Sequence, residues 1–333
     1  MAGRHHAQVY ATGVCAGDRV MLSQAITLIE STRESDMTLA AEVSQLCLPH
    51  TGRSFRIGIT GPPGVGKSTF IEALGSYLTR SGHTVAVLAI DPSSTRTRGS
   101  ILGDKTRMTT LARDPQAYIR PSPSGGSLGG VARQTRDTLL LCEAAGFDII
   151  LVETVGVGQS ETAVSDMVDF FLLLALPHAG DELQGIKKGI METADGIVVH
   201  KADGELLARA RSAAATLRQA LRYFPPGDAG LRPEVLLCSS LTQTGIDEVW
   251  RLLQAYRSHT VATGYWELRR QRQRITWVEE ALRERLERTF FRQAGVSALW
   301  ETLRPDVQDN TCAPAQAVEL LIQAWQTQRG EMP

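Results

Sequence analysis

The sequence predicts an α/β fold with a mainly parallel central sheet flanked by helices, and with helical extensions at both ends of the chain. Between Phe55 and about Ser240, seven short apolar runs rich in Val, Ile and Leu alternate with stretches of helical periodicity. This alternation is typical of a parallel sheet whose two faces are both covered by helices. The segments on either side show only the helical spacing of apolar residues.

The N-terminal extension is expected over residues 1–52, helical from about residue 16 to residue 50, where Pro49 and Gly52 end the pattern. The central domain is expected over residues 53–258. Its strand candidates are, in order, Ile57–Thr60, Val85–Ile90, Tyr118–Arg120, Ile149–Glu153, Phe170–Leu176, Ile197–His200 and Val235–Cys238.

From Gly245 onward the chain is predicted to be entirely helical, and residues 259–333 form the C-terminal helical region. Helices are expected over Gly264–Arg292, near Gln293–Leu303 and after Pro314. The longest of them carries apolar residues among many charges and is a candidate dimerisation arm.

Four arginines of that long helix, Arg269, Arg270, Arg272 and Arg274, invite two interpretations. They could bind nucleic acid, or they could form the solvated face of a helix. Glutamates follow the arginines along the helix and the net charge of the chain is only −1. These charges favour the solvated face.

Composition limits the classes of protein that remain. The chain has 333 residues, of which 43% are hydrophobic, as expected for a globular protein. The five cysteines are scattered without a C-x-x-C pair, and the first residues do not resemble a secretory signal. The longest apolar run, Phe170–Pro177, is too short to cross a bilayer. We therefore expect a cytoplasmic protein with reduced thiols, and with neither a nucleic acid nor a membrane as its partner.

The most informative motif follows the first strand candidate and precedes a helical pattern. It reads G-x-x-x-x-G-K-S and, with the next residue, comprises Gly61, Pro62, Pro63, Gly64, Val65, Gly66, Lys67, Ser68 and Thr69. Strand, glycine-rich loop and helix in this order predict a phosphate-binding loop, in which backbone N–H groups and a helix N-terminus hold phosphate oxygens. Lys67 is expected to reach the β- and γ-phosphates, and the Ser68 hydroxyl to bind Mg²⁺. The fold prediction therefore becomes that of a P-loop NTPase.

Acidic residues at the ends of other strands predict the metal site. Glu153 ends a buried strand, and the run from Glu153 to Gly156 has the spacing of the D-x-x-G element of GTPases, so the N–H of Gly156 could reach the γ-phosphate. Asp91 ends a second strand, and Asp104 lies in a glycine-rich stretch, where it could alternatively cap a helix. Ser68, Asp91, Asp104 and Glu153 are the expected Mg²⁺ ligands, and Lys67, Asp91 and Glu153 the expected catalytic residues.

The base-binding element is expected after the sixth strand candidate, where His200, Lys201 and Asp203 occupy an N/T-K-x-D pattern. A carboxylate at Asp203 can accept from both the ring N–H and the exocyclic amine of guanine, and the Lys201 stem can lie over the purine ring. His200 replaces the usual asparagine. Ser239, Ser240 and Leu241 follow the last strand candidate and are expected to form a second loop against the base.

At this level of detail the chain resembles the MeaB/ArgK family of cobalamin-mutase-associated GTPases, which includes the methylmalonic aciduria type A protein. The resemblance covers most of the chain. The matching stretches are Gly61–Thr69, Asp91–Ser94, Gly99–Met108, Tyr118–Pro123, Leu128–Gly130, Glu153–Glu161 and Gly180–Gly189.

The resemblance implies a homodimeric, Mg²⁺-dependent GTPase that binds GTP and GDP. It further implies a chaperone that gates cofactor loading of adenosylcobalamin-dependent methylmalonyl-CoA mutase and protects that enzyme. Gln184 and Lys187 would lie in a third switch segment. Besides His200, Arg98 departs from the family pattern, because glycine is common there.

Slow basal turnover is expected. Val157 follows Gly156, so no catalytic glutamine stands where small GTPases place one, and no arginine finger can be identified. Two alternatives remain. A nickel metallochaperone GTPase is disfavoured by the lack of a His-rich or C-x-x-C tract. An ATP-using kinase linked to amino-acid transport is left open by His200.

Overall fold

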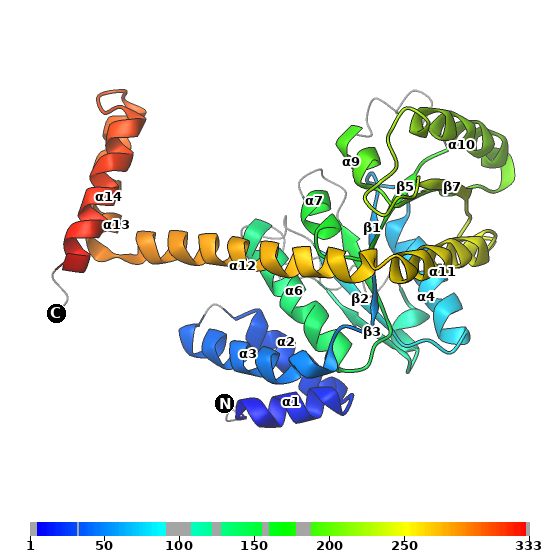
Figure 1. Ribbon diagram of the computed structural model, residues 1–333, viewed down its shortest axis with the longest axis horizontal. Helices are drawn as coiled ribbons and strands as arrows, with labels where there is room; N and C mark the ends of the chain where they lie inside the picture. The colour runs from blue at the N-terminus through cyan, green and yellow to red at the C-terminus, as the bar shows by residue number, and fades with distance from the viewer. Residues whose placement is uncertain are drawn as a thin grey trace. The chain divides into compact units, whose positions relative to one another are not determined.

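The computed structural model describes residues 5–31, 33–90, 108–121, 128–154, 160–177 and 188–330 (Figure 1). The chain forms two compact units, Met1–Gln273 and Arg274–Pro333. The domain boundaries expected at residues 52 and 258 stay a prediction.

The described residues of the first unit contain a seven-stranded sheet in which every pair of neighbouring strands is parallel. The strand order is β3-β2-β4-β1-β5-β6-β7. The strands are β1 (Phe55–Thr60), β2 (Val85–Ile90), β3 (Ala117–Arg120), β4 (Ile149–Thr154), β5 (Phe170–Ala175), β6 (Gly196–Val199) and β7 (Glu234–Leu237). The α/β prediction is confirmed, because all seven candidates become strands whose ends lie within two residues of those expected.

Helices cover both faces of this sheet (Figure 1). The helices α4 (Lys67–Arg80) and α11 (Ile246–Ala262) enclose one apolar core with β1, β2, β4 and β5. On the other face, α9 (Lys188–Thr193) and α10 (Leu207–Leu221) pack on β5, β6 and β7, while α6 (Leu128–Ala144) contacts β2 and α7 (Ser160–Ser165) contacts β1. Gly58 lets α7 approach, since a Cβ there would lie 2.9 Å from Val164 Cγ1.

The N-terminal extension consists of three helices, α1 (Ala7–Cys15), α2 (Arg19–Ile29) and α3 (Glu34–Cys47), followed by the 3₁₀ turn η1 (Leu48–His50). The helical part therefore begins earlier than the expected residue 16. Asp18 starts α2, because its carboxylate accepts from the backbone N–H groups of Val20 and Met21. All three helices pack on α6. They therefore extend the layer that covers one face of the sheet.

Two of the four clustered arginines, Arg269 and Arg270, are largely buried and paired with carboxylates, so the solvated-face interpretation is wrong for them. The side chain of Arg270 is only 3% exposed and donates to both carboxylate oxygens of Asp169, at 2.8 and 2.6 Å. Its other N–H groups donate to the carbonyls of Gly52 and Ser54, and the guanidinium stacks on Trp266. Arg269 pairs with Asp195 at 3.0 Å. Arg272, in contrast, is 62% exposed, as expected.

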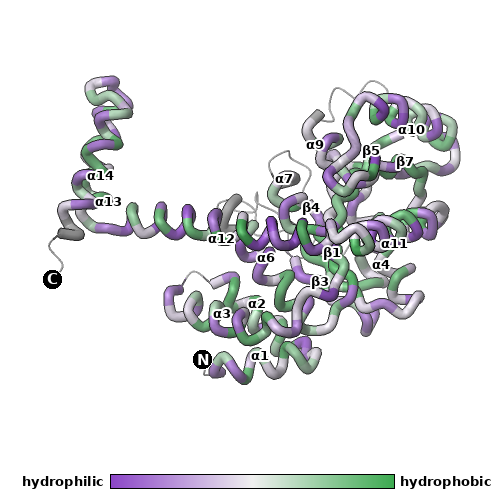
Figure 2. The backbone as a smooth tube through the Cα atoms, in the orientation of Figure 1, coloured by the Kyte–Doolittle hydropathy of each residue, from purple (hydrophilic) through white to green (hydrophobic). Residues whose placement is uncertain are grey.

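The C-terminal unit contains most of α12 (Tyr265–Arg292) together with α13 (Ala294–Gln308) and α14 (Pro314–Gly330). Val296, Leu303, Ala317 and Leu321 form its buried core. Hydrophilic and hydrophobic residues alternate along α12 in Figure 2. None of the helices in the described ranges is both long enough and apolar enough to cross a lipid bilayer.

Candidate nucleotide site

The phosphate-loop motif occupies the turn between β1 and α4, as predicted. Gly61, Gly64 and Gly66 have φ angles of 148°, 78° and 96°, which side chains with a Cβ rarely adopt. At Gly61 a Cβ would also lie 2.5 Å from the carbonyl oxygen of Leu174. The loop therefore requires glycine at these positions, and it leads directly into the N-terminus of α4, where backbone N–H groups can bind an anion.

Lys67 is the first residue of α4, and its side chain folds back across the loop. Lys67 is buried, and its ammonium group donates to the carbonyl oxygens of Gly61 and Pro62, at 2.8 and 3.3 Å. A positive charge is thus held within the loop whose N–H groups would face the same phosphate.

Ser68 and Glu153 meet beside this loop. β1 and β4 are neighbours, and their register pairs Ile59 with Glu153, which brings the carboxylate next to the loop. Ser68 Oγ donates to Glu153 Oε1 at 2.8 Å, and both residues are buried. A hydroxyl and a carboxylate side by side form part of an oxygen ligand set of the kind that Mg²⁺ prefers.

The base-binding element lies at the carboxyl ends of β6 and β7. His200 follows β6 and is 2% exposed. Its Nδ1 lies 2.7 Å from the carbonyl oxygen of Val65, and its Nε2 lies 2.7 Å from Ser240 Oγ. The imidazole thus joins the phosphate loop to the loop that follows β7. Burial is the main cause of a lowered pKa for His200, and the nearby charge of Lys201 lowers the pKa further.

The other residues of this element contact the phosphate loop and the segment that follows β7. Lys201 has a φ of 59°, and its ammonium donates to the carbonyl oxygen of Gly64 at 2.7 Å. The Asp203 carboxylate accepts a hydrogen bond from the Ser239 hydroxyl, which fixes one of its oxygens. Leu241 is 84% exposed, so it is accessible to a ligand. The structure therefore brings Lys201, Asp203 and the Ser239–Leu241 segment together beside the phosphate loop.

Several predicted site residues lie outside the described part of the chain. They are Asp91, Asp104, Gly156, Gln184 and Lys187. Arg98, which departs from the family pattern, lies outside the described residues too. Within the described ranges, no group of three or more His, Cys, Asp or Glu side chains is placed to hold a metal.

Two contacts of the site were not predicted from the sequence. The Val65 carbonyl accepts a hydrogen bond from His200, which is 135 positions away in the chain. Thr154 Oγ1 donates to Thr60 Oγ1 at 3.0 Å between neighbouring strands. Only the strand order brings these residues together, so no local pattern could have shown the contacts.

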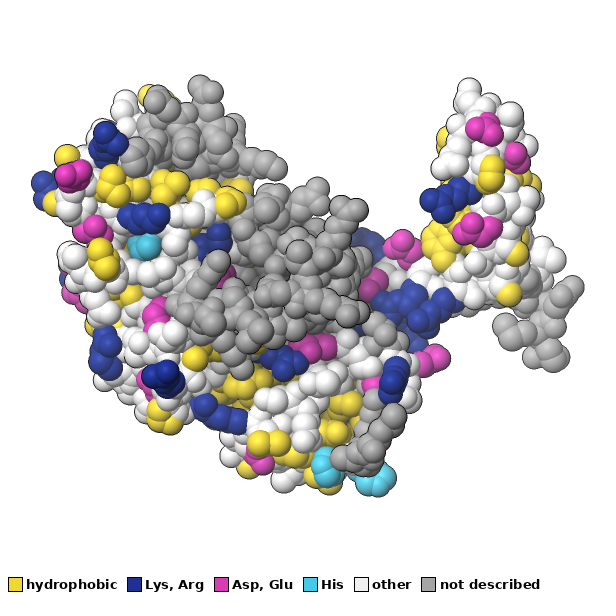
Figure 3. Space-filling view, turned by 180° about the vertical axis from the view of Figure 1, so that it is seen from behind, with side chains coloured by type: hydrophobic (Ala, Val, Ile, Leu, Met, Phe, Trp, Pro, Cys, Tyr) yellow, Lys and Arg dark blue, Asp and Glu magenta, His cyan; other side chains and the backbone are white. Residues whose placement is uncertain are grey.

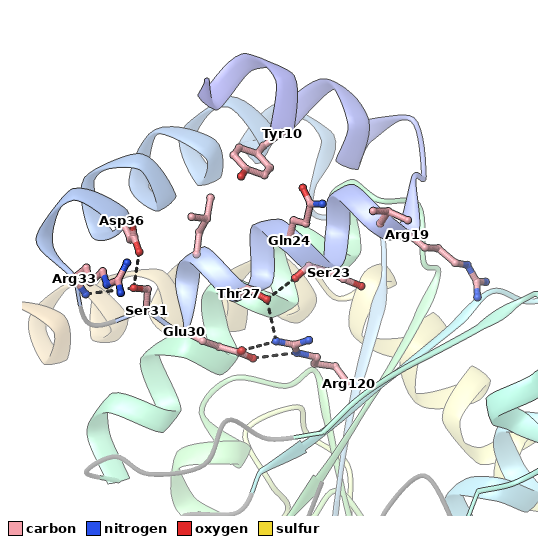
Figure 4. Close-up of a pocket in the computed structure, with 12 residues that line it drawn as sticks. Tyr10, Arg19, Ser23, Gln24, Thr27, Glu30, Ser31, Arg33, Asp36 and Arg120 are labelled. Atoms are coloured by element: carbon pink, nitrogen blue, oxygen red, sulfur yellow. Dashed lines mark hydrogen bonds and ion pairs between the residues drawn. The ribbon is translucent and has the colours of Figure 1, made fainter. Parts of the chain in front are cut away.

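A groove of about 910 Å³ lies elsewhere, between the N-terminal helices and β3 (Figure 4). None of the predicted site residues lines it. Four of its five charged lining residues are already engaged: Arg120 pairs with Glu30, Arg19 donates to the carbonyl of Ala117, and Asp36 accepts from Ser31. We therefore place the candidate site at the phosphate loop.

Comparison with known proteins identifies the family. Residues 22–294 match the model of a protein family described as methylmalonyl-CoA mutase-associated GTPase MeaB. The chain belongs to the MeaB family. The MeaB-family chain is therefore a GTPase: it binds guanine nucleotide and hydrolyses GTP.

Individual MeaB relatives and a solved structure agree with this assignment. A probable GTPase of Mycobacterium tuberculosis is 50% identical over 94% of this chain and 93% of its own length. The mitochondrial methylmalonic aciduria type A homolog of Mus musculus is 43% identical over 95% of this chain and 79% of its own length. The crystal structure of a LAO/AO transport system kinase superposes with a TM-score of 0.77 at 35% identity, covering 98% of this chain and 99% of that one.

Proposed function

We propose that this GTPase acts as a chaperone of adenosylcobalamin-dependent methylmalonyl-CoA mutase, gating cofactor loading and protecting that enzyme. The observation that supports the nucleotide site best is the joint placement of Lys67 and the Ser68–Glu153 pair at one phosphate loop. The name of the matched family supports the choice of partner.

Mg²⁺ fits the residues present. Ser68 and Glu153 supply a hydroxyl and a carboxylate oxygen within hydrogen-bonding distance of each other, and Mg²⁺ usually combines one or two such protein ligands with phosphates and water. Asp91 and Asp104 would add carboxylates. When bound, Mg²⁺ would neutralise charge on the β- and γ-phosphates.

The protein's own part in hydrolysis is electrostatic. Lys67 and the backbone N–H groups of Gly61–Thr69 would hold the phosphates and stabilise the charge that develops on the γ-phosphoryl group. Gly156 would add one more N–H, and Lys67, Asp91 and Glu153 act as the catalytic set. His200, Lys201, Asp203, Ser239, Ser240 and Leu241 would form the base side of the site. We expect slow basal turnover, increased when a partner orders the switch segments, which include Gln184 and Lys187.

A homodimer is part of this proposal. In the C-terminal unit, Ile275, Val278, Leu282 and Leu286 recur every three or four residues of α12, so they share one face, and each is 53–66% exposed. Figure 3 shows hydrophobic side chains at the surface of this unit, and basic and acidic side chains interspersed over the face in view. An apolar stripe of this kind suits a second copy of the same helix better than a nucleic acid.

Two experiments test the proposed function. First, purified protein is compared for GTP and ATP hydrolysis, with Lys67→Ala and, as a control at the far end of α4, Arg80→Ala. GTP should be preferred, and Lys67→Ala should lower turnover on the order of 100-fold while Arg80→Ala changes it little. A preference for ATP, or full GTP hydrolysis by Lys67→Ala, would contradict the proposed guanine-nucleotide site.

The second experiment measures co-elution with methylmalonyl-CoA mutase in the presence of GDP or a non-hydrolysable GTP analogue. The amount of complex should depend on the nucleotide. If no nucleotide-dependent association with the mutase is found while GTP hydrolysis is intact, the chaperone role is wrong and the nucleotide site stands.

A further inference from the structure

His200 is held from two sides, by residues far from it in the sequence. Nδ1 faces the Val65 carbonyl of the phosphate loop and Nε2 faces the Ser240 hydroxyl, each at 2.7 Å. The ring lies edge-on against Phe70, with centroids 5.9 Å apart. A Cβ on Gly66 would come within 2.9 Å of the imidazole Cε1, so the ring also packs directly on the loop backbone.

These partners fix the tautomer of the ring. A carbonyl oxygen can only accept, so the proton must be on Nδ1. The ring is neutral at pH 7, because burial and the charge of Lys201 lower the pKa of His200. Nε2 is then a bare acceptor, and the Ser240 hydroxyl donates to it. Both ring nitrogens are therefore occupied within the protein.

Asparagine, the residue usual at this place, has different hydrogen-bonding capacity. Its amide offers two N–H donors, so it can serve a backbone carbonyl with one and a ligand with the other. A neutral histidine has a single donor, and here Val65 receives it. The N7 atom of guanine is only an acceptor. In this tautomer and orientation, His200 therefore has no donor to offer to N7.

We propose that His200 is a positioning residue, tying the phosphate loop to the base-binding loop, and that this chain recognises guanine without a hydrogen bond from His200 to N7. Guanine is then distinguished at its Watson–Crick edge by Asp203, whose carboxylate the Ser239 hydroxyl orients. This inference rests on the proposed base side of the site. It specifies how that site differs from one built on asparagine.

Binding of 7-deaza-GTP, in which N7 is replaced by C–H, tests the inference directly. The wild-type chain should bind GTP and 7-deaza-GTP with affinities within about twofold of each other. His200→Asn restores a donor and should bind GTP about three- to tenfold more tightly than 7-deaza-GTP, which is the usual worth of one hydrogen bond. A penalty of that size in the wild type would overturn the inference, and this comparison needs no variant to fold.

The positioning role is tested separately by the binding of inorganic tripolyphosphate, which has no base. His200→Ala should weaken the binding of tripolyphosphate, GTP and 7-deaza-GTP by a similar factor, because it loosens the phosphate loop. Ser240→Ala leaves the hydrogen bond between His200 and Val65 in place. It should therefore weaken the binding of tripolyphosphate less than His200→Ala does. If His200→Ala weakened GTP alone, His200 would act on the base and the inference would be wrong. Absence of GTP binding by the wild type would overturn the proposed site and this inference together.

Discussion

Ser68 Oγ and Glu153 Oε1 are joined by a 2.8 Å hydrogen bond although the two residues are 85 positions apart in the chain. Ser68 lies in the first turn of α4, and Glu153 lies near the carboxyl end of β4. The pair is buried. In the proposed metal site, a buried carboxylate with one oxygen oriented in this way would be preorganised for a divalent cation beside the phosphate loop.

The first prediction concerns the charge of that carboxylate. Glu153→Gln keeps an acceptor for the Ser68 hydroxyl but removes the negative charge. We expect the Mg²⁺ concentration for half-maximal GTP hydrolysis to rise roughly 10- to 100-fold, as found when residues that support a metal site are replaced. Glu248→Gln, an exposed carboxylate of α11, is the control and should leave the Mg²⁺ requirement unchanged. An unchanged requirement in Glu153→Gln would remove Glu153 from the metal site.

The second prediction concerns the stability of the fold at acidic pH. Because the pKa of His200 is lowered in the folded chain, chiefly by burial, the unfolded chain takes up a proton more readily. The stability that depends on neutral His200 is present above its ordinary pKa of about 6.5 and is lost as pH falls from there through the lowered pKa of the folded state. The hydrogen bond with the Val65 backbone and, to a smaller extent, the charge of Asp203 oppose the shift, since both raise the pKa of His200.

Urea midpoints measured between about pH 8 and pH 5 should therefore fall more steeply for the wild type than for His200→Asn, which has no titrating group at this position. The comparison cancels the contributions of other groups that titrate in both proteins. Equal slopes for the two proteins would mean that His200 is not held neutral in the fold.

Local sequence patterns predicted most of the fold but not the partners of buried polar groups. β5, Phe170–Ala175, was predictable because a strand covered on both faces is apolar throughout. Arg270 was not, since helical periodicity cannot show which arginine of a charged helix faces a carboxylate 101 residues away. For the same reason the sequence placed His200 near the base but could not show its bonds to Val65 and Ser240.

The third prediction tests this buried ion pair. Arg270→Ala leaves the Asp169 carboxylate, 2% exposed, without the guanidinium that compensates its charge. Removing one partner of a buried pair typically costs about 3–5 kcal/mol, so the free energy of unfolding should fall by that amount. Arg272→Ala, whose exposed side chain is 3.7 Å from Asp228, is the matched control and should change stability by less than about 0.5 kcal/mol. Similar losses of unfolding free energy in both variants would show that the buried pair contributes no more to stability than the exposed one.

The last prediction concerns the proposed dimer. If the exposed stripe of α12 is covered by a second copy, Leu282→Glu places a charge in an apolar contact and should convert the dimer to a monomer. Light scattering during gel filtration would then give about half the wild-type mass. Glu287→Lys also changes the charge of an exposed position on α12 but lies off the stripe, so it should leave the mass unchanged. A wild-type chain that is monomeric at micromolar concentration, or a Leu282→Glu variant of unchanged mass, would rule out this helix face as the dimer contact.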